Sequence, residues 1–395
     1  MVGAGPAGGA LAGLLAQRGV DVLLIDRLGD LHRGAFSSAA MPRAAVERFA
    51  VPAAVQAARW RGWRLVGPGD GERHWDSAEP LGAVLDFGAL RQWLADRAQA
   101  QGARLALGLT ALTWEQRHDG TVLTTVRGSA GGHHGIRSDW VVDASGEGRA
   151  LIGDPPAHHG LVSGLGVEWL LQVDQRRWQP WRERLSFFLG SGWVRQGYGW
   201  IFPMTPGRLK LGICRLEDGR RDQPPLALEL RRLMERTELA DALVLDRHGG
   251  RIRSTIRRRE PHRRGRLIGL GDAVSTANLL GGEGIRHALL AAEVLAPLLA
   301  AAVDSGDHPQ RWGGHDPLGR YEARLRGALG WRWSLSGRLA RRTWLGLESV
   351  AGDRRLQRLL DGLAGCSAAE LSALLFDYRF ERYGRRALPY LLGWR

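Results

Sequence analysis

The sequence predicts an α/β fold in which a Rossmann-like parallel sheet with a β-meander is interleaved with an antiparallel sheet and followed by a helical region. Three observations lead to this prediction. A glycine motif at residues 3–8 precedes a helical pattern and then a buried strand. Alternating apolar residues separated by turn residues fill 160–260, as is typical of an antiparallel sheet. Residues 317–395 are rich in Arg, Leu and Trp at helical spacing.

The first motif is a G-x-G-x-x-G formed by Gly3, Gly5 and Gly8. In a dinucleotide-binding unit the first glycine allows a tight turn out of a strand. The second lets backbone approach a pyrophosphate, which the helix N-terminus attracts, and the third lets the helix pack on the sheet. The next strand, 20–25, ends at Asp26, where an acid can hold ribose hydroxyls. The predicted dinucleotide site also includes Pro6, Ala7 and Arg27.

Only Met1 and Val2 precede the motif, although the strand before such a turn normally lies in mid-sheet and supplies several apolar residues. Either the native chain starts further upstream or the central strand is stunted, and we favour the first interpretation. It predicts that restoring about five upstream apolar residues raises cofactor occupancy and the melting temperature. A longer chain that shows neither effect contradicts it.

The composition, 44% hydrophobic and 24% charged over 395 residues, is that of a globular protein large enough for two or three lobes. Cys214 and Cys366 lie far apart, which argues against a disulfide scaffold or a cysteine metal site. No signal-peptide pattern opens the chain, and the longest apolar run, 288–303, is interrupted by Glu293 and Pro297. We expect a cytoplasmic protein without a metal, with a peripheral membrane location as the alternative.

The net charge of +14 comes almost entirely from arginine, because Lys210 is the only lysine. Solvated arginine faces, attraction to an anionic membrane surface and nucleic-acid binding are three interpretations of this charge. No recognised nucleic-acid module appears, so we expect no nucleic-acid partner. The helical pattern after residue 317 fits either a cap on the sheet or a helix on a membrane surface.

Three later motifs resemble those of the flavoprotein superfamily that includes aromatic hydroxylases, halogenases and geranylgeranyl reductases. They are D-A-S-G with Asp143 and Gly146, G-D-A with Gly271 and Asp272, and G-G-E-G-I at 281–285. The resemblance implies FAD as cofactor, with Asp143, Gly146, Gly271 and Asp272 among the residues that bind it. The acid of the G-D-A motif is implied on the ribityl or pyrophosphate side of FAD. The resemblance also implies that a helix start faces the flavin pyrimidine edge, where it stabilises the negative charge of reduced flavin. The residues implied there are Gly281, Gly282, Gly284 and Ile285.

A fifth motif, Y-x-W-x-F-P at 198–203, resembles the signature of the geranylgeranyl reductase family. Tyr198, Trp200 and Phe202 alternate along a strand, so their rings are expected on one face. Such a face suits a long apolar chain and excludes water from a reduced flavin. The three rings are therefore our candidate catalytic residues. The alternative is that they belong to the ordinary core of the sheet. Halogenases instead carry W-x-W-x-I-P and a catalytic lysine. The only lysine here, Lys210, sits in a predicted strand away from the glycine segment, which argues against halogenation.

The sequence departs from the family pattern at two places. Ser37 and Ser38 stand where the family often has a Cys-Gly pair, which puts a thiol role near the flavin in doubt. Phe87 replaces the arginine that opens the third helix, predicted over 87–101 with Asp86 as its N-cap. Arg91, one turn further on, either reaches the pyrophosphate or lies on the surface.

We expect a discontinuous FAD-binding domain at 1–45, 81–155 and 262–310. A substrate-binding β-sheet domain is expected at 46–80 and 156–261, with one of its strands at 192–196. A C-terminal helical region is expected at 311–395.

The resemblance implies an FAD-dependent oxidoreductase that reduces carbon–carbon double bonds of an isoprenoid or similar apolar lipid. NAD(P)H or a ferredoxin-like protein would donate electrons transiently, since no second G-x-G-x-x-G is evident. Tyr198 is expected near the reacting alkene, with water as the final proton source. The alternatives are a monooxygenase of an apolar or aromatic substrate, a carotenoid-cyclase-like flavoprotein and a flavin-binding protein without turnover.

Overall fold

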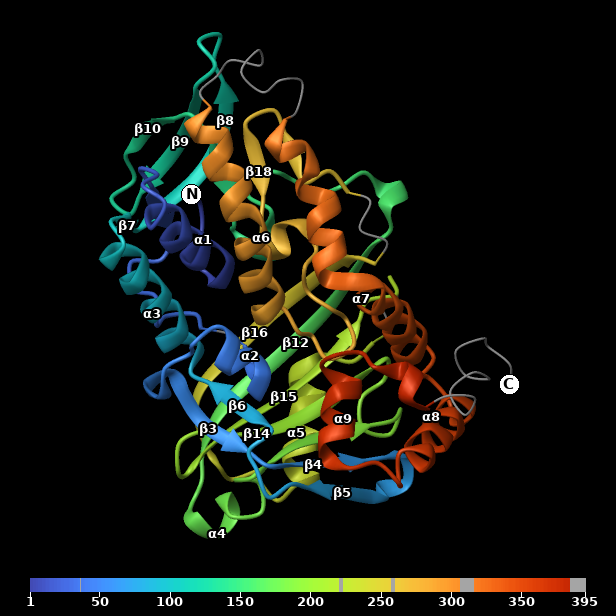
Figure 1. Ribbon diagram of the computed structural model, residues 1–395. Coiled ribbons are helices and arrows are strands. Elements are labelled where there is room, and N and C mark those ends of the chain that lie inside the picture. The colour runs from blue at the N-terminus through green and yellow to red at the C-terminus, as the bar shows by residue number, and fades with distance from the viewer. Residues whose placement is uncertain (36, 220–222, 257–259, 306–315, 384–395) are drawn as a thin grey trace.

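The computed structural model describes residues 1–35, 37–219, 223–256, 260–305 and 316–383. Figure 1 shows a lobe built around α1 and α6 and a second lobe built on long strands, with helices α7, α8 and α9 along one side. Phe36, 306–315 and 384–395, which belong to the segments predicted above, lie outside the described residues.

A parallel sheet carries the N-terminus in its middle. Val2 bridges Ile25 on one side and Asp143 on the other, both in parallel. Two further parallel pairings, β1 with β7 and β11 with β18, widen the sheet, and β17 adds an antiparallel edge. The carboxyl ends of the parallel strands therefore meet at one edge, where such folds bind ligands. The strands are β1 (Leu23–Asp26), β7 (Arg104–Leu107), β11 (Val141–Asp143), β17 (Arg263–Arg264) and β18 (Leu267–Gly269).

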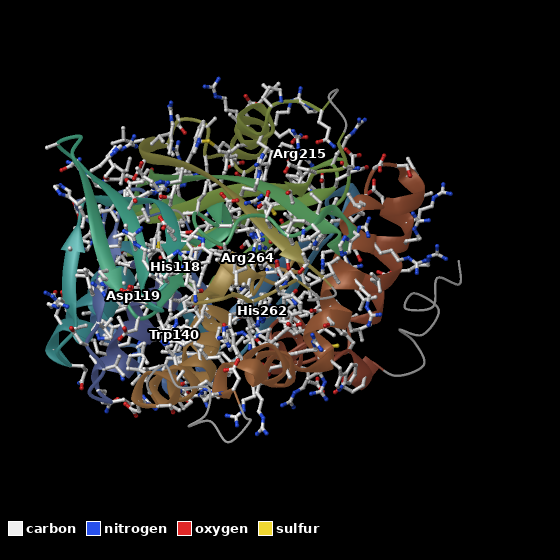
Figure 2. All side chains as sticks on the ribbon, turned by 90° about the horizontal axis from the view of Figure 1, so that it is seen from above. His118, Asp119, Trp140, Arg215, His262 and Arg264 are labelled. Carbon is white, nitrogen blue, oxygen red and sulfur yellow. The ribbon has the colours of Figure 1, made fainter. Side chains whose placement is uncertain are left out.

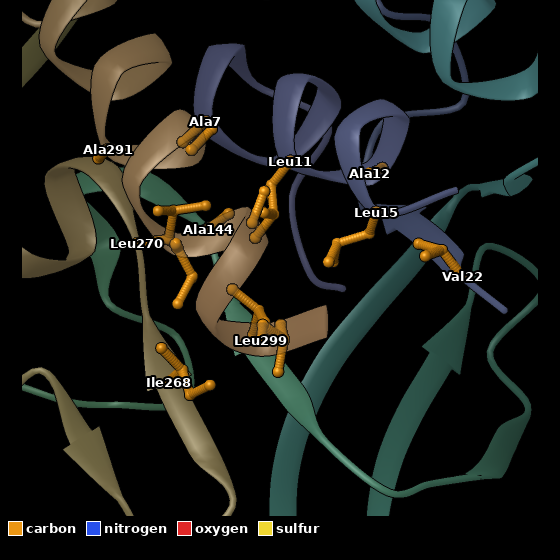
Figure 3. Packing of buried hydrophobic residues seen from close by; sticks show 14 of the residues in the cluster. Ala7, Leu11, Ala12, Leu15, Val22, Ala144, Ile268, Leu270, Ala291 and Leu299 are labelled. Carbon is orange, nitrogen blue, oxygen red and sulfur yellow. The ribbon is translucent and has the colours of Figure 1, made fainter. Parts of the chain in front are cut away.

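Helices cover one face of this sheet and a β-meander covers the other. The helices are α1 (Pro6–Ala16), α3 (Phe87–Ala100) and α6 (Ile285–Asp304), and the meander is β8 (Leu109–Gln116), β9 (Val122–Gly128) and β10 (His133–Ser138). Figure 3 shows Leu11 and Leu15 of α1 directed towards Leu270 and Leu299. Small residues dominate this contact, so α1 and α6 lie close together and the start of each helix is held in place. The predicted cap of α3 is confirmed, because the Asp86 carboxylate accepts from the Ala89 N–H at 3.0 Å.

The second lobe is a seven-stranded sheet in the order β16-β12-β15-β14-β13-β4-β5. All neighbours pair antiparallel except β13 and β4. Helix α5 (Leu226–Arg236) covers one face through Leu230 and Leu233, and the opposite face carries the rings of Tyr198, Trp200 and Phe202. The strands are β4 (Gly62–Val66), β5 (Glu72–Asp76), β12 (Leu161–Gln172), β13 (Arg184–Leu189), β14 (Gly197–Pro203), β15 (Arg208–Leu216) and β16 (Leu243–Thr255).

A small sheet lies beside the first lobe, and the C-terminal helices lie on the large sheet. The small sheet has the order β2-β6-β3. Tyr198 of the large sheet and Trp344 of α7 are 5.0 Å apart between ring centroids, and Phe376, directly after α9, is 5.7 Å from Trp63. These contacts make the C-terminal helices a wall over the aromatic face. The elements are β2 (Ala40–Pro42), α2 (Arg43–Arg48), β3 (Gln56–Trp60), β6 (Gly82–Leu85), α4 (Gln175–Trp178), α7 (Tyr321–Leu345), α8 (Val350–Gly362) and α9 (Ala368–Leu375).

The strand predicted at 192–196 is wrong, because the chain turns there. The N–H groups of Trp193 and Val194 both donate to the Gly190 carbonyl, and Gln196 has a φ of +59°. Backbone folded back in this way cannot continue a ladder of strand hydrogen bonds.

Charged side chains project from much of the outline of the molecule, and Figure 2 shows their nitrogen tips on all sides of the view. Many arginines pair with carboxylates on the surface, as Arg184 does with Asp76 at 2.8 Å. Within the described residues α6 is the one helix long and apolar enough to cross a membrane, and 61% of that stretch is buried inside the structure. Its apolar character is therefore explained in large part by packing against α1 and α7.

The packing of α1 predicts unequal effects for two leucines of that helix. Leu11 is fully buried, whereas Leu14 is only half-buried. Leu11→Ala is expected to lower the free energy of unfolding by about 2–5 kcal/mol because it leaves a cavity. Leu14→Ala is the matched control, with a clearly smaller loss. Urea denaturation followed by circular dichroism measures both, and equal losses would contradict the packing described here.

Candidate functional site

The N-termini of α1 and α6 open onto one cavity of about 590 Å³. Gly5 is the N-cap of α1, Gly284 is the N-cap of α6, and neither helix has a side-chain cap. The first N–H groups of each helix are therefore left for another acceptor. Two positive helix ends at one cavity favour a ligand that carries negative charge at two places.

The three motif glycines have three different surroundings. Gly3 has a φ of +102°, and a Cβ there would lie 2.4 Å from the carbonyl oxygen of Ala144. A Cβ on Gly8 would lie 1.9 Å from the carbonyl oxygen of Gly3, so α1 packs on the turn only because this residue is glycine. A Cβ on Gly5 would meet nothing within 4 Å, which leaves the backbone open to a ligand. Gly3, Gly5, Pro6 and Ala7 line the cavity, whereas Gly8 lies behind it.

Asp26, Arg27 and Arg91 line the same cavity. The Asp26 carboxylate accepts from the N–H of Ala4 at 2.7 Å and of Leu28 at 2.9 Å, which fixes it at the strand end. Arg91 is 7% exposed, so the alternative of a surface arginine is wrong. Its guanidinium donates to the carbonyls of Leu31 and Arg33, its Nε has no partner within the described residues, and burial lowers its pKa. A buried guanidinium among the residues that line the cavity suits a phosphate group.

The second half of the cavity is formed by the residues before α6. Asp272, Gly281, Gly282, Gly284 and Ile285 line it together. The Asp272 carboxylate accepts from the Thr276 hydroxyl at 3.0 Å, and burial raises its pKa. Gly281 has open space where a Cβ would stand. A ligand that extends through the cavity from the start of α1 therefore meets exposed backbone and the Asp272 carboxylate at the α6 end of the cavity.

Asp143 and Gly271 do not line the cavity, which corrects their expected contact with a cofactor. The Asp143 side chain is fully buried, and its carboxylate accepts from three backbone N–H groups, those of Ser145, Leu151 and Ile152, which compensate for the burial. It shapes the turn that carries Gly146, which does line the cavity. A Cβ on Gly271 would lie 2.7 Å from that of Ala7, so this glycine allows the close approach of α1.

The three rings predicted to share a face do so. Tyr198, Trp200 and Phe202 are buried on β14 and all line the cavity. Burial raises the pKa of the Tyr198 phenol well above its usual value. The phenol therefore keeps its proton at any ordinary pH while it faces the cavity.

An apolar tunnel of about 270 Å³ lies between these rings and the C-terminal helices. Phe187, Tyr198, Phe202, Gly281 and Gly282 line both the tunnel and the cavity, so the two spaces join beside the rings. Ser37 and Ser38 also lie at this junction. The wall of the tunnel away from the cavity is formed by Trp63, Leu65, Leu189, Leu339, Leu360, Leu363, Leu371, Leu374, Leu375 and Phe376.

Sequence reasoning missed two parts of this site. One is the tunnel wall from α8 and α9, whose leucines gave only a helical pattern. The other is a pair of buried charged residues, Glu168 and Lys210, on the aromatic face of the large sheet. A charged residue within an otherwise apolar strand signals a buried partner, and this signal was available in the sequence.

Comparison with known proteins agrees with this geometry. Residues 1–45 match the family described as FAD binding domain. The chain is 31% identical over 333 residues to a menaquinone reductase of Mycobacterium tuberculosis, covering 79% of this chain and 78% of that protein. It is 25% identical over 321 residues to a digeranylgeranylglycerophospholipid reductase of Haloferax volcanii, covering 78% and 76%. A geranylgeranyl bacteriochlorophyll reductase-like structure from Thermoplasma acidophilum superposes with a TM-score of 0.79 at 20% identity, covering 98% and 97%.

Fold, cavity and relatives together define an FAD-dependent oxidoreductase. The open helix ends, the guanidinium of Arg91 and the exposed backbone at Gly281 fit the pyrophosphate and the flavin edge of FAD. The chain belongs to the geranylgeranyl reductase family of FAD-dependent oxidoreductases, and is of the geranylgeranyl reductase or menaquinone reductase type.

Gly5→Val tests the assignment of the α1 end to the cofactor. The new side chain enters open space, so the apoprotein is expected to fold, with only the small loss of stability that a valine N-cap brings. It would occupy the place of the pyrophosphate and raise the Kd of FAD at least about tenfold, or about 1.4 kcal/mol. Gly29→Val, also in open space but outside the cavity, is the matched control. Equal FAD affinity in both variants, measured by calorimetry, would show that the start of α1 does not bind the cofactor.

Proposed function

We propose that the protein reduces carbon–carbon double bonds in the isoprenoid chain of a lipid. The observation that carries the proposal is the apolar tunnel that joins the cofactor cavity beside Tyr198 and Phe202. The names of the menaquinone and digeranylgeranylglycerophospholipid reductases point to lipid substrates for those relatives. Bound FAD would supply the hydride, with NAD(P)H or a ferredoxin-like protein as the proposed donor of electrons.

The chain's own residues would bind the tail and keep the reacting bond dry. Leucine and aromatic side chains along the tunnel bury an extended hydrocarbon, which gains about 0.8 kcal/mol for each buried CH₂. Tyr198 would hold its phenol proton at the junction, close to the bond that is reduced, with water as the final proton source. The surrounding rings exclude bulk water from that place.

An anaerobic assay tests this function. The chemically reduced holoenzyme is incubated with an isoprenoid quinone, a carotenoid, a geranylgeranyl phospholipid and a chlorophyll precursor. Flavin reoxidation with the gain of two hydrogen atoms in one of these lipids is the expected result, read by mass spectrometry. If the flavin is reoxidised only in a parallel aerobic incubation, with insertion of an oxygen atom into the lipid, the protein is instead a monooxygenase. Isomerisation without a mass change would indicate a cyclase-like enzyme, and no response would favour a non-catalytic role.

Leu375→Trp tests the tunnel itself. Leu375 lines the tunnel from α9, and an indole there would shorten the space for the tail. KM for a long isoprenoid substrate is expected to rise about tenfold, because the substrate loses the binding energy of one or two buried CH₂ groups. Leu228→Trp, at a 43% exposed position on α5, is the control. FAD affinity should stay unchanged in both variants, and an unchanged KM in Leu375→Trp would exclude this tunnel as the tail site.

The same proposal includes contact with an anionic membrane, from which the lipid would enter. Six exposed arginines follow the C-terminal half of α7 and the length of α8, and one of them, Arg358, also lines the tunnel. Each arginine near an anionic bilayer contributes about 1 kcal/mol of attraction at moderate salt. The six are Arg338, Arg341, Arg342, Arg354, Arg355 and Arg358.

Vesicle sedimentation tests this contact. The triple variant of Arg338, Arg341 and Arg342 to Gln is expected to lose at least about tenfold in binding to phosphatidylglycerol vesicles. A matched triple variant on the first lobe, of Arg18, Arg97 and Arg127 to Gln, should bind like the wild type. Equal binding by the two variants would show that net charge alone, and not this face, attracts the membrane.

A further inference from the structure

Two buried charged side chains stand on the aromatic face of the large sheet and have no part in the function described so far. Glu168 on β12 is 2% exposed and Lys210 on β15 is 7% exposed. Charged groups buried to this extent are costly unless each has a partner. Their partners are therefore informative about what the pair does.

Glu168 holds the indole of Trp200. The Trp200 Nε1–H donates to Glu168 Oε2 at 2.9 Å, although β15 lies between their two strands. Gly212 on β15 pairs with both residues, and a Cβ there would lie 2.2 Å from Trp200 Cζ2. The indole therefore lies flat across β15, and it reaches Glu168 only because position 212 has no side chain.

Lys210 connects the same cluster to the loop at the junction. Its ammonium donates to the Ser37 carbonyl at 2.6 Å and lies 3.4 Å from the Leu85 carbonyl oxygen. Lys210 also attracts Glu168 electrostatically, although burial on balance raises the pKa of Glu168 and lowers that of Lys210. Ser37 lines both the cavity and the tunnel, so the pair links Trp200 to the place where the two spaces meet.

We propose that Glu168 is a positioning residue that fixes the indole of Trp200 as a wall of the cofactor cavity, with Gly212 as the groove in which the indole lies. Trp200 lines the cavity but not the tunnel, whereas Tyr198 and Phe202 line both. The contact between Glu168 and Trp200 therefore affects the orientation of the reacting part of the substrate and not the binding of its tail in the tunnel. The kinetic part of this proposal rests on the proposed function, and the structural part does not.

The structural part is tested on the apoprotein by the exchange of the Trp200 indole proton with solvent. Its NMR resonance is assigned by its loss in Trp200→Phe. Glu168→Leu removes the acceptor, so protection from exchange is expected to fall at least about tenfold. Glu168→Gln keeps an acceptor oxygen and is expected to retain most of the protection. Equal protection in wild type and Glu168→Leu would overturn the proposal, because the contact would then not hold the ring.

The kinetic part is tested on the holoenzyme. Glu168→Leu and Gly212→Ala are both expected to lower kcat by about 10- to 100-fold through misplacement of the reacting segment, with KM for the long substrate within about twofold of wild type. Glu168→Gln should recover most of kcat. Gly199→Ala is the matched control, since its Cβ would meet Leu233 on the opposite face of the sheet. A kcat that stays at the wild-type value in Glu168→Leu, or that falls equally in Gly199→Ala, would overturn the positioning role.

The visible circular dichroism of bound flavin separates failure of this inference from failure of the proposed function. If no lipid is reduced by the wild type, the proposed function fails. The inference then still predicts that Glu168→Leu and Gly212→Ala change the flavin spectrum as Trp200→Phe does, while Gly199→Ala does not. A wild-type spectrum in Glu168→Leu would overturn the inference in that case as well. Should Glu168→Leu fail to fold, Gly212→Ala and Glu168→Gln carry the same comparison.

Discussion

The structure depends on two helix starts that lack side-chain caps and open onto one cavity. The first N–H groups of the helices that begin after Gly5 and Gly284 have no side-chain cap, and the positive helix ends attract negative charge. Residues far apart in the chain reach this arrangement because α1 and α6 pack directly on each other over small side chains. A ligand that carries a pyrophosphate in its middle and an electron-accepting ring at one end can satisfy both helix ends, and FAD has this form.

The rest of the molecule adds an apolar compartment to that polar one. The aromatic face of β14 forms the boundary between them, and helices α7 to α9 close the far side of the tunnel. Two buried polar groups on this boundary are held by partners: the Trp200 indole by Glu168 and the Lys210 ammonium by the Ser37 carbonyl. Fixed polar groups beside an apolar tunnel are what the proposed reduction of an unactivated double bond would require.

Local patterns in the sequence predicted the parts of this site that short segments determine. The glycine motif, the cap at Asp86 and the shared face of the three rings depend on residues within one turn or one strand, and the structure shows each of them. The role of Asp143 was mistaken because its three N–H partners come from a loop whose path the sequence did not reveal. The tunnel and the Glu168–Trp200 contact could not be predicted, because they depend on strand order and on which helices cover the sheet.

Calorimetric titration of the apoprotein with FAD, FMN and ADP tests the central claim most directly. If the helix ends of α1 and α6 share one cavity, FAD binds at one site per chain and both smaller ligands compete with it. FMN and ADP then each bind far more weakly than FAD, because each satisfies only one end. FMN that binds as tightly as FAD, or ADP that does not compete, would show that the two helix ends do not serve one cofactor.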